Sequence, residues 1–223
     1  LEAAHRRGLP IVVCDQPAND ARFPFVGIDD AQAIAPTAQT LIDAGHRHIG
    51  ILCIRLSPDS NNGPVTPQRL AQAQHHVQQA RVQGALDIFA RAGIPPESVP
   101  IIERHINDPE NNIDAARELL HTHPELTAVL CTTDTIALGV LEYATSQGIS
   151  VPADLSVTGF DGISTALIRN ITTVLQPNKT KGAAAGKVLH HMVEGLDYDK
   201  TTILDVGFHS GGTVASPKFS QGG

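Results

Sequence analysis

The sequence has no apolar run long enough to cross a membrane. Its longest apolar runs, 49–54 and 126–131, contain six residues each, whereas a membrane-spanning helix needs roughly 20. The first eight residues also lack the basic start, the apolar stretch and the small-residue cleavage site of a secretory signal. We therefore expect neither a membrane segment nor an export signal.

Cysteine is also scarce. The three thiols, Cys14, Cys53 and Cys131, are isolated, and each lies inside or at the end of an apolar run. An odd number of cysteines without C-x-x-C spacing argues against disulfides and zinc sites. We expect reduced thiols that are buried in the core of a cytoplasmic protein.

Basic residues are too few to give this segment an affinity for nucleic acid. Lysine and arginine together number 16 against 23 aspartates and glutamates, and the net charge is -7 at pH 7. Binding to a phosphate backbone depends on clustered Lys and Arg. If the protein binds DNA, another segment must provide the contact.

Signatures of enzymes and metal sites are missing. The sequence contains no G-x-S-x-G, no H-E-x-x-H and no G-x-G-x-x-G that opens a helix after a strand. The nearest match to a phosphate-binding loop, 182–188, is one residue short and has Val188 where magnesium needs Ser or Thr. No third ligand at metal spacing accompanies the three histidine pairs, at 46 and 48, 75 and 76, and 190 and 191. We expect no enzymatic activity, no cofactor and no metal.

The composition and the periodicity predict an α/β protein. A hydrophobic fraction of 41% with 17% charged residues is typical of a globular chain, and 223 residues suit one or two domains. Short apolar runs alternate with segments of helical period, which indicates a parallel sheet covered by helices on both faces. The expected strands are 10–14, 49–54, 99–103, 128–131, 155–158, 171–175 and 203–206, and the expected helices are 31–44, 81–92, 113–121, 135–147 and 182–193.

The segment 57–79 fits neither kind of element. It begins with loop residues rich in Pro, Asn and Gly and continues into a Gln/His-rich stretch. A connection of this length inside a compact domain is uncommon and is usually functional or disordered. Two interpretations stay open: a lid over a binding cleft, and a solvated excursion.

Carboxylates follow three of the expected parallel strands, where open α/β sheets bind ligands. Asp15 follows the first strand, Thr133 and Asp134 follow 128–131, and Asp161 follows 155–158. Each has a local alternative, because Asp134 could cap its helix and Asp161 could shape a turn. Together they suggest a ligand rich in hydroxyl groups.

Seven stretches, in order, resemble the LacI/GalR family of bacterial repressors. They are Gly8-Leu9-Pro10-Ile11-Val12-Val13-Cys14-Asp15, Val26-Gly27-Ile28-Asp29-Asp30, Gly45-His46-Arg47-His48-Ile49-Gly50, Arg81-Val82-Gln83-Gly84, Thr133-Asp134-Thr135-Ile136-Ala137-Leu138-Gly139, 151–161 (VPADLSVTGFD) and 171–177 (ITTVLQP). Because they occur in register across nearly the whole chain, the match is specific.

The resemblance implies two doubly wound parallel-sheet lobes joined by three crossovers, the type I fold of periplasmic binding proteins. Residues 1–28 and 178–206 would form an N-terminal lobe that is incomplete in this chain. Residues 29–177 and 207–223 would form the C-terminal lobe. The DNA-binding helix-turn-helix headpiece is expected to lie outside this sequence, which would then be a fragment.

The resemblance also implies effector-binding positions. Arg81 matches an effector-contacting arginine, whose guanidinium suits vicinal hydroxyls or a carboxylate. Asp161 matches an aspartate that accepts hydrogen bonds from the effector, and Asp15 matches the end of a strand at the cleft. The remaining expected positions are Ile28 at the first crossover, Thr133, Asp134 and Gln176. Thr133 stands where the family often has Asn, and two further departures are Ala33 for a frequent glycine and Ser210 for a usual arginine.

The function implied is that of the effector-binding and dimerisation domain of a LacI-type repressor. It would sense a sugar or a related small polar metabolite, form a homodimer, and reach operator DNA through its headpiece. The helix 30–44 and the region 86–89 are expected to contribute to the dimer interface. The alternative is a periplasmic sugar-binding protein of a transport system, and the sequence upstream would distinguish the two. A doubly wound enzyme is a further rival, although no nucleophile accompanies the carboxylates.

Overall fold

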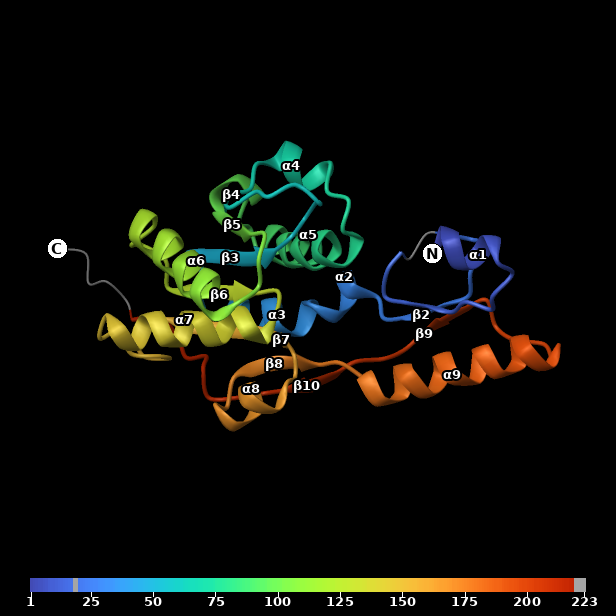
Figure 1. Cartoon of the computed structure of the whole chain (residues 1–223). Helices are drawn as coiled ribbons and strands as arrows, with labels where there is room; N and C mark the ends of the chain where they lie inside the picture. Colours follow the sequence, from blue (N-terminus) through green and yellow to red (C-terminus); the bar gives the residue numbers. More distant parts are fainter. Residues whose placement is uncertain (18–19, 219–223) are drawn as a thin grey trace. The chain divides into compact units, whose positions relative to one another are not determined.

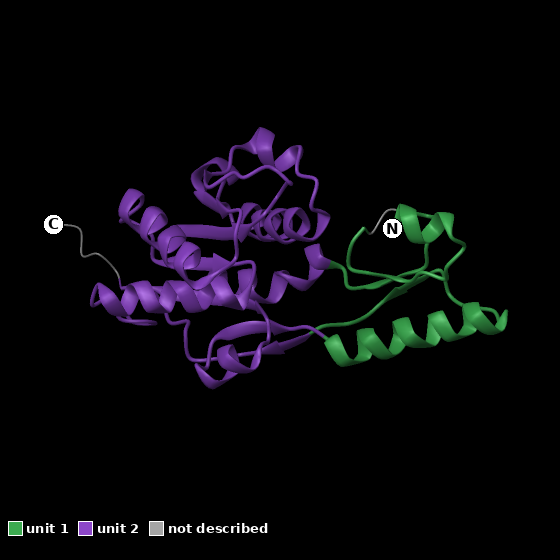
Figure 2. Ribbon diagram, in the orientation of Figure 1, with its two compact units in different colours: residues 1–29, 177–206 green, residues 30–176, 207–223 purple. Residues whose placement is uncertain are grey.

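The computed structural model describes residues 1–17 and 20–218, and these fall into two units (Figure 2). Unit 1 comprises Leu1–Asp29 and Pro177–Val206, and unit 2 comprises Asp30–Gln176 and Gly207–Gly223. The chain therefore passes between the units three times. Each break lies at most one residue from a crossover expected from the sequence. Assignment of the units to the two lobes of a complete protein stays a prediction.

Unit 2 is built on a seven-stranded sheet (Figure 1). Its strand order is β10 (Gly207–His209), β8 (Thr172–Leu175), β7 (Ser156–Asp161), β6 (Ala128–Cys131), β3 (Ile49–Ile54), β5 (Ile101–Arg104) and β4 (Gly63–Pro64). The five central strands are parallel, whereas β10 and β4 are antiparallel to their neighbours. The parallel sheet expected from the alternating pattern is confirmed, with short antiparallel strands at both edges.

Helices cover both faces of this sheet, which explains why its middle strands β6 and β3 carry no polar side chain. On one face, α6 (Pro109–Thr122) and α7 (Asp134–Ser146) pack on each other and on the side chains of Leu52, Val129 and Val157. The alternate strand residues point to the other face, where α3 (Ala35–Asp43) contacts β6 to β8 and α5 (His76–Arg91) contacts β3.

Close approach between α5 and α2 (Asp30–Ala33) depends on one glycine. A Cβ atom added at Gly84 would lie 2.3 Å from the carbonyl oxygen of Ala31. Only a residue without a side chain permits that separation. The contact places the start of α2, where Asp30 lies, beside the middle of α5, which carries Arg81.

Several element boundaries differ from those expected. The helix expected over 31–44 is divided into α2 and α3, with Pro36 in the first turn of α3, because proline lacks the N–H that would continue the earlier helix. The strand expected over 10–14 is only β1 (Val13–Cys14), and the strand expected over 203–206 is β9 (Thr201–Ile203). The final strand, β10, was not expected. Helix α5 begins at His76, five residues before the expected start.

The segment 57–75, here called the strap, is folded. It contains β4 and the short helix α4 (Pro67–Ala71), which is capped by the Thr66 hydroxyl accepting from the N–H of Arg69. The strap is attached to β5 through the fully buried carboxylate of Glu103. The strap is thus an ordered excursion in which most residues are exposed, and its opening as a lid stays a prediction.

All four donors to Glu103 come from the strap or the residue before it. Leu56 N–H donates at 2.7 Å, Asn61 Nδ2 at 2.8 Å, and Arg69 donates through Nε at 2.6 Å and Nη2 at 3.1 Å. Arg69 also binds Asp59 at 2.9 and 3.1 Å. A buried carboxylate is stable only when its charge is compensated in this way.

Unit 1 holds a three-stranded parallel sheet in the order β1, β2 (Phe25–Gly27) and β9, which contacts α9 (Asn178–Glu194). The short helix α1 (Glu2–Arg6) precedes the sheet in the chain and has no buried residue. The strands are two or three residues long, so few backbone groups pair. Unit 1 consequently has a much smaller core than unit 2.

One further expectation is corrected. Cys14 is exposed, and only Cys53 and Cys131 are the buried thiols expected of all three. Within the region 86–89, expected at a dimer interface, Leu86 and Phe89 are 4% and 0% exposed, whereas Asp87 is exposed. A contribution of this region to a dimer interface stays a prediction.

Candidate functional site

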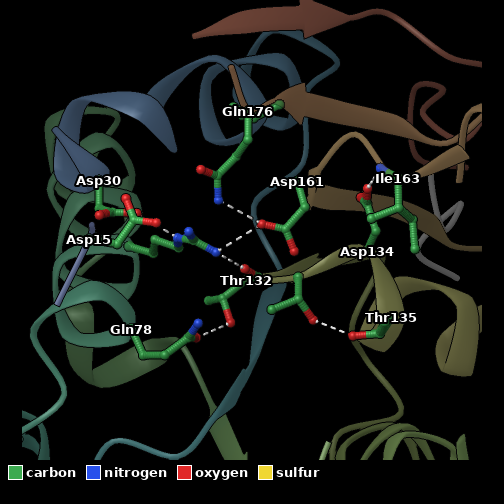
Figure 3. Close-up of polar contacts among 12 residues, drawn as sticks. Asp15, Asp30, Gln78, Thr132, Asp134, Thr135, Asp161, Ile163 and Gln176 are labelled. Atoms are coloured by element: carbon green, nitrogen blue, oxygen red, sulfur yellow. Dashed lines mark hydrogen bonds and ion pairs between the residues drawn. The ribbon is translucent and has the colours of Figure 1, made fainter. Parts of the chain in front are cut away.

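Polar side chains meet at the carboxyl ends of β6, β7 and β8. Asp161 is the last residue of β7, and Gln176 follows β8. The amide Nε2 of Gln176 donates to Asp161 Oδ1 at 2.9 Å, and Arg81 Nη1 lies 3.4 Å from the same oxygen. Figure 3 shows the side chains of Gln176 and Asp161 turned toward each other. We call Arg81, Asp161 and Gln176 the Arg81 cluster.

Arg81 is held almost entirely by the protein. Its side chain is 5% exposed. Nε donates to Asp30 Oδ1 at 2.8 Å, and Nη1 donates to the carbonyl oxygen of Thr132 at 2.9 Å. The guanidinium also stacks over the ring of Phe160, with Cζ 3.7 Å from the ring centroid. A desolvated stack of this kind contributes about 2 kcal/mol, so Arg81 is fixed before any ligand arrives.

Asp161 is the most accessible charged group of the cluster. Its side chain is 25% exposed, against 5% for Arg81. Its backbone has φ +118°, a conformation that costs a non-glycine residue about 1 to 3 kcal/mol. Strain of this size persists where the surroundings determine the geometry, and it is frequent at binding sites. The carboxylate thus has a fixed position and remains open to a small polar molecule.

Neighbouring residues extend the polar wall. The hydroxyl of Thr132 donates to Gln78 Oε1 at 2.6 Å, as drawn in Figure 3. Gln78 and Arg81 both lie on the first turns of α5, so the early start of that helix supplies two members of the wall. Gln78, Thr132 and Asp30 were not expected at the site.

Asp134 has a structural environment. It is fully buried, and its Oδ1 accepts from the Thr173 hydroxyl at 2.6 Å while its Oδ2 accepts from the N–H of Ile163 at 2.8 Å. A Cβ at Gly159 would lie 2.2 Å from Oδ1, so only glycine leaves room for this carboxyl. Burial raises the pKa of Asp134 from 3.8 to about 6. The side chain joins β8 to the loop after β7, and no ligand reaches it in this conformation.

Thr133 caps α7 in place of Asp134. Its hydroxyl accepts from the N–H of Ile136 at 3.3 Å and lies 2.8 Å from the hydroxyl of Thr135. Thr135 in turn donates to Asn107 Oδ1 at 2.9 Å. Thr133 is 5% exposed, so its first role is to begin the helix.

Two of the expected positions, Asp15 and Ile28, lie in unit 1. Asp15 has φ +63°, and Lys181 Nζ donates to its Oδ2 at 2.8 Å. Lys181 is a buried lysine on α9 that the sequence interpretation missed, although the same helix was considered as a phosphate loop. Ile28 follows β2 and is 6% exposed, so its side chain belongs to the core of the unit.

No cluster of three or more His, Cys, Asp or Glu side chains that could hold a metal ion occurs within residues 1–17 and 20–218. Over the same residues, no helix is both long and apolar enough to cross a membrane.

Comparison with known proteins places this fold in a family. A model of the periplasmic binding protein-like domain matches residues 38–213. The chain belongs to the periplasmic binding protein-like family. Its relatives within the family are LacI-type regulators, which confirms the predicted fold class and the resemblance to LacI/GalR proteins.

Two of these relatives share extensive identity with the chain. The HTH-type transcriptional regulator IpsA of Corynebacterium glutamicum is 54% identical over 96% of this chain and 60% of its own length. An HTH-type transcriptional regulator of Mycobacterium tuberculosis is 39% identical over 85% of this chain and 53% of its own length. The chain thus spans between half and two thirds of these relatives.

Solved structures of the family agree with the fold. A LacI-family transcriptional regulator from Corynebacterium glutamicum superposes with a TM-score of 0.92 at 54% identity, covering 96% of this chain and 63% of that one. A LacI-family regulator from Enterococcus faecium, solved with bound ribose, has a TM-score of 0.80 at 22% identity over 97% and 75% of the two chains. The second likeness concerns the fold alone.

Proposed function

We propose that this chain is the effector-binding and dimerisation part of a LacI-type transcriptional regulator. A sugar or related polyhydroxylated metabolite binds against Asp161 and Gln176 and alters the binding of operator DNA by another part of the protein. The net charge of -7 supports that division of labour, because this segment has no overall attraction for DNA. The identity to HTH-type regulators supports it as well.

The observation that carries the proposal is the Arg81 cluster at the strand ends. A carboxylate accepts hydrogen bonds from hydroxyl groups, and the carboxamide of Gln176 can both donate and accept. Arg81 touches three protein oxygens and is buried, so its role is to position Asp161. Thr133 and Asp134 hold the surrounding loops, and we assign them no direct contact with the effector.

The central test is ligand binding by Asp161→Asn. Thermal-shift screening of sugars, sugar alcohols and nucleosides identifies a ligand, since binding to the native state raises stability. Asparagine keeps the shape of Asp161 and tolerates a positive φ, so the variant removes mainly the charge. We expect affinity to fall by about 1 to 3 kcal/mol, or roughly 5- to 150-fold.

The matched control is Asp43→Asn, an exposed carboxyl on α3 that accepts a hydrogen bond from the Gln39 amide. It should bind the ligand as the natural chain does. Equal affinity in Asp161→Asn and Asp43→Asn would remove Asp161 from the effector site.

Homodimerisation is part of the proposal, because a regulator of a palindromic operator must share the two-fold symmetry of its site. Light scattering of the full-length protein should give twice the mass of one chain. A monomer that still binds a palindromic operator as one unit would contradict this part.

A transport receptor has the same fold, and a doubly wound enzyme has a similar one. The regulator is favoured over the receptor by the relatives at 54% and 39% identity. A helix-turn-helix upstream of residue 1 supports the regulator, and a signal peptide supports the receptor. Chemical conversion of the ligand found by thermal shift would favour the enzyme.

A further inference from the structure

A hollow in unit 2 lies beside the beginning of β5, away from the strand ends that carry the Arg81 cluster. Its volume is about 610 Å³, within the range of pockets that hold small molecules. The strap forms one wall, and α5, the turn 96–98 and the end of α6 form the others. We call it the strap pocket. No member of the Arg81 cluster lines it, so an inference about it is independent of the proposed function.

The strap wall of the pocket carries apolar side chains and is held in place. The strap contributes three apolar side chains that are not buried, namely Pro64, Val65 and Ala71. The strap wall is fixed by the bonds from Arg69 to Glu103 and by the Gln79 amide, which donates to the carbonyl oxygen of Leu70 at 2.9 Å. The insertion thus builds a preformed cavity.

The polar groups around the hollow carry negative charge. Glu97, Glu118, Glu125 and His123 line it, and its lining among the described residues contains neither Lys nor Arg. Glu118 binds Arg104 at 2.6 Å, whereas Glu125 lies 3.3 Å from the ring of His123. An apolar interior with carboxylates on its lining fits a molecule with an apolar body and a cationic end.

We propose that the strap pocket binds small amphiphilic amines, with the apolar part against Pro64, Val65 and Ala71 and the ammonium group facing Glu97 and Glu125. Burial of the apolar part supplies affinity, and the carboxylates supply selectivity for a positive charge. This gives the strap a role beyond covering the edge of the sheet.

Three probes of the same shape test the charge requirement. They are 4-phenylbutylamine, which is cationic at pH 7, 4-phenylbutan-1-ol, which is neutral, and 4-phenylbutanoate, which is anionic. Methyl NMR of Val65, Leu70 and Leu86 in the full chain reports binding. We expect saturable shifts with the amine, affinity about fivefold weaker with the alcohol, and no shifts with the carboxylate. Equal affinity for all three, or none for the amine, overturns the proposal.

Variants locate the binding. Ala71→Trp should fill the hollow and abolish binding of the amine, whereas Gln72→Trp adds the same ring one residue later, outside the pocket lining. The double variant Glu97→Gln with Glu125→Gln should reduce the affinity for the amine to that for the alcohol and leave the latter unchanged. Unaltered amine binding in both the filled and the neutralised variants overturns the assignment, and the neutralised variant decides it if Ala71→Trp does not fold.

Discussion

Arg81 is the side chain on which the geometry of the candidate site depends most. Its charge alone would not explain its position, since a lysine carries the same charge. The planar guanidinium can stack on Phe160 while it donates to Asp30 and to the carbonyl oxygen of Thr132. A lysine ammonium has neither the flat face nor the fork. The substitution Arg81→Lys therefore separates charge from shape.

We predict that Arg81→Lys lowers the free energy of unfolding by about 2 to 3 kcal/mol, because it loses the stack and leaves buried oxygens without donors. Urea denaturation measures the change. The control is Arg91→Lys on the same helix, where the exposed side chain donates to the carbonyl oxygen of Asp87, and this variant should stay within about 0.5 kcal/mol of the natural chain. Equal stability of the two variants would show that the ion pair alone holds Arg81.

The raised pKa of Asp134 predicts that the free energy of unfolding depends on pH. In the folded chain its pKa is raised to about 6 by burial, from 3.8, so between these values the native state binds more protons than the unfolded state. Stability from this group is complete below about pH 4 and is lost as the pH rises through 6. The loss is at most about 3 kcal/mol.

The variant Asp134→Asn removes this titration. Its unfolding free energy relative to the natural chain should rise between pH 4 and pH 6 and stay constant above pH 7, as measured by urea denaturation across that range. Asp43→Asn should show no such rise. A difference that is independent of pH would mean that Asp134 does not titrate in this window.

The strap shows how one buried charge can organise an element. Glu103 has no exposure and accepts from four donors, so replacement by Gln puts an amide donor where Asn61 or Arg69 already donates. We predict that Glu103→Gln accelerates amide exchange at Gly63 and Val65 by at least about 100-fold, since breaking a buried pair costs about 3 to 5 kcal/mol.

Two comparisons make the strap prediction specific. Asp59→Asn weakens only the ion pair between Arg69 and the exposed carboxylate of Asp59, and it leaves the bonds to Glu103 in place. This variant should accelerate exchange by less than about tenfold. Glu110→Gln, an exposed change on α6, should have no effect on the strap. If Glu103→Gln alters exchange equally throughout unit 2, the strap opens only with global unfolding.

The elements that could be predicted from the sequence are those whose burial is purely apolar. β3 and β6 have the expected bounds because every residue of 49–54 and 128–131 suits a strand covered on both faces. The beginning of α5 was missed because its buried face includes Gln78 and Arg81. Polar residues can be buried there only because Asp30 and Thr132, about 50 residues distant in each direction, supply partners. Spacing along the chain does not reveal such pairs, and the same holds for Lys181 with Asp15.

The candidate site was foreseen in part for the same reason. Asp161 and Gln176 lie where strand ends and the family resemblance indicated, and Arg81 lies beside Asp161. Asp134 was expected at the same edge, yet its side chain turns inward. A strand end fixes the position of a residue, whereas the direction of its side chain depends on neighbours such as Gly159 and Thr173. Effector contact by any of these residues stays a prediction.

The two units differ in how much apolar surface each can bury. Unit 1 contains 59 residues, a size at which only about 60% of the surface of the unfolded chain is removed from water. Its buried apolar side chains are Val13, Phe23, Val26, Ile28 and Val188, whereas nearly all of the remaining core belongs to unit 2. Large apolar side chains also remain exposed on it, namely Leu1, Leu9, Leu189, Val193, Leu196, Tyr198 and Ile203.

We predict that unit 1 opens well before unit 2 when this chain is studied alone. The amides of Phe25 and Leu204, which pair within unit 1, should exchange at least about 100-fold faster than those of Ile51 and Thr132 in the sheet of unit 2. The physical reason is that exchange follows local stability, and a hundredfold corresponds to about 3 kcal/mol. Hydrogen exchange measured by mass spectrometry resolves the two units, and thermal unfolding should show two transitions. Exchange rates that agree within about threefold, together with a single transition, would contradict this prediction. They would mean that the two units unfold together as one cooperative unit.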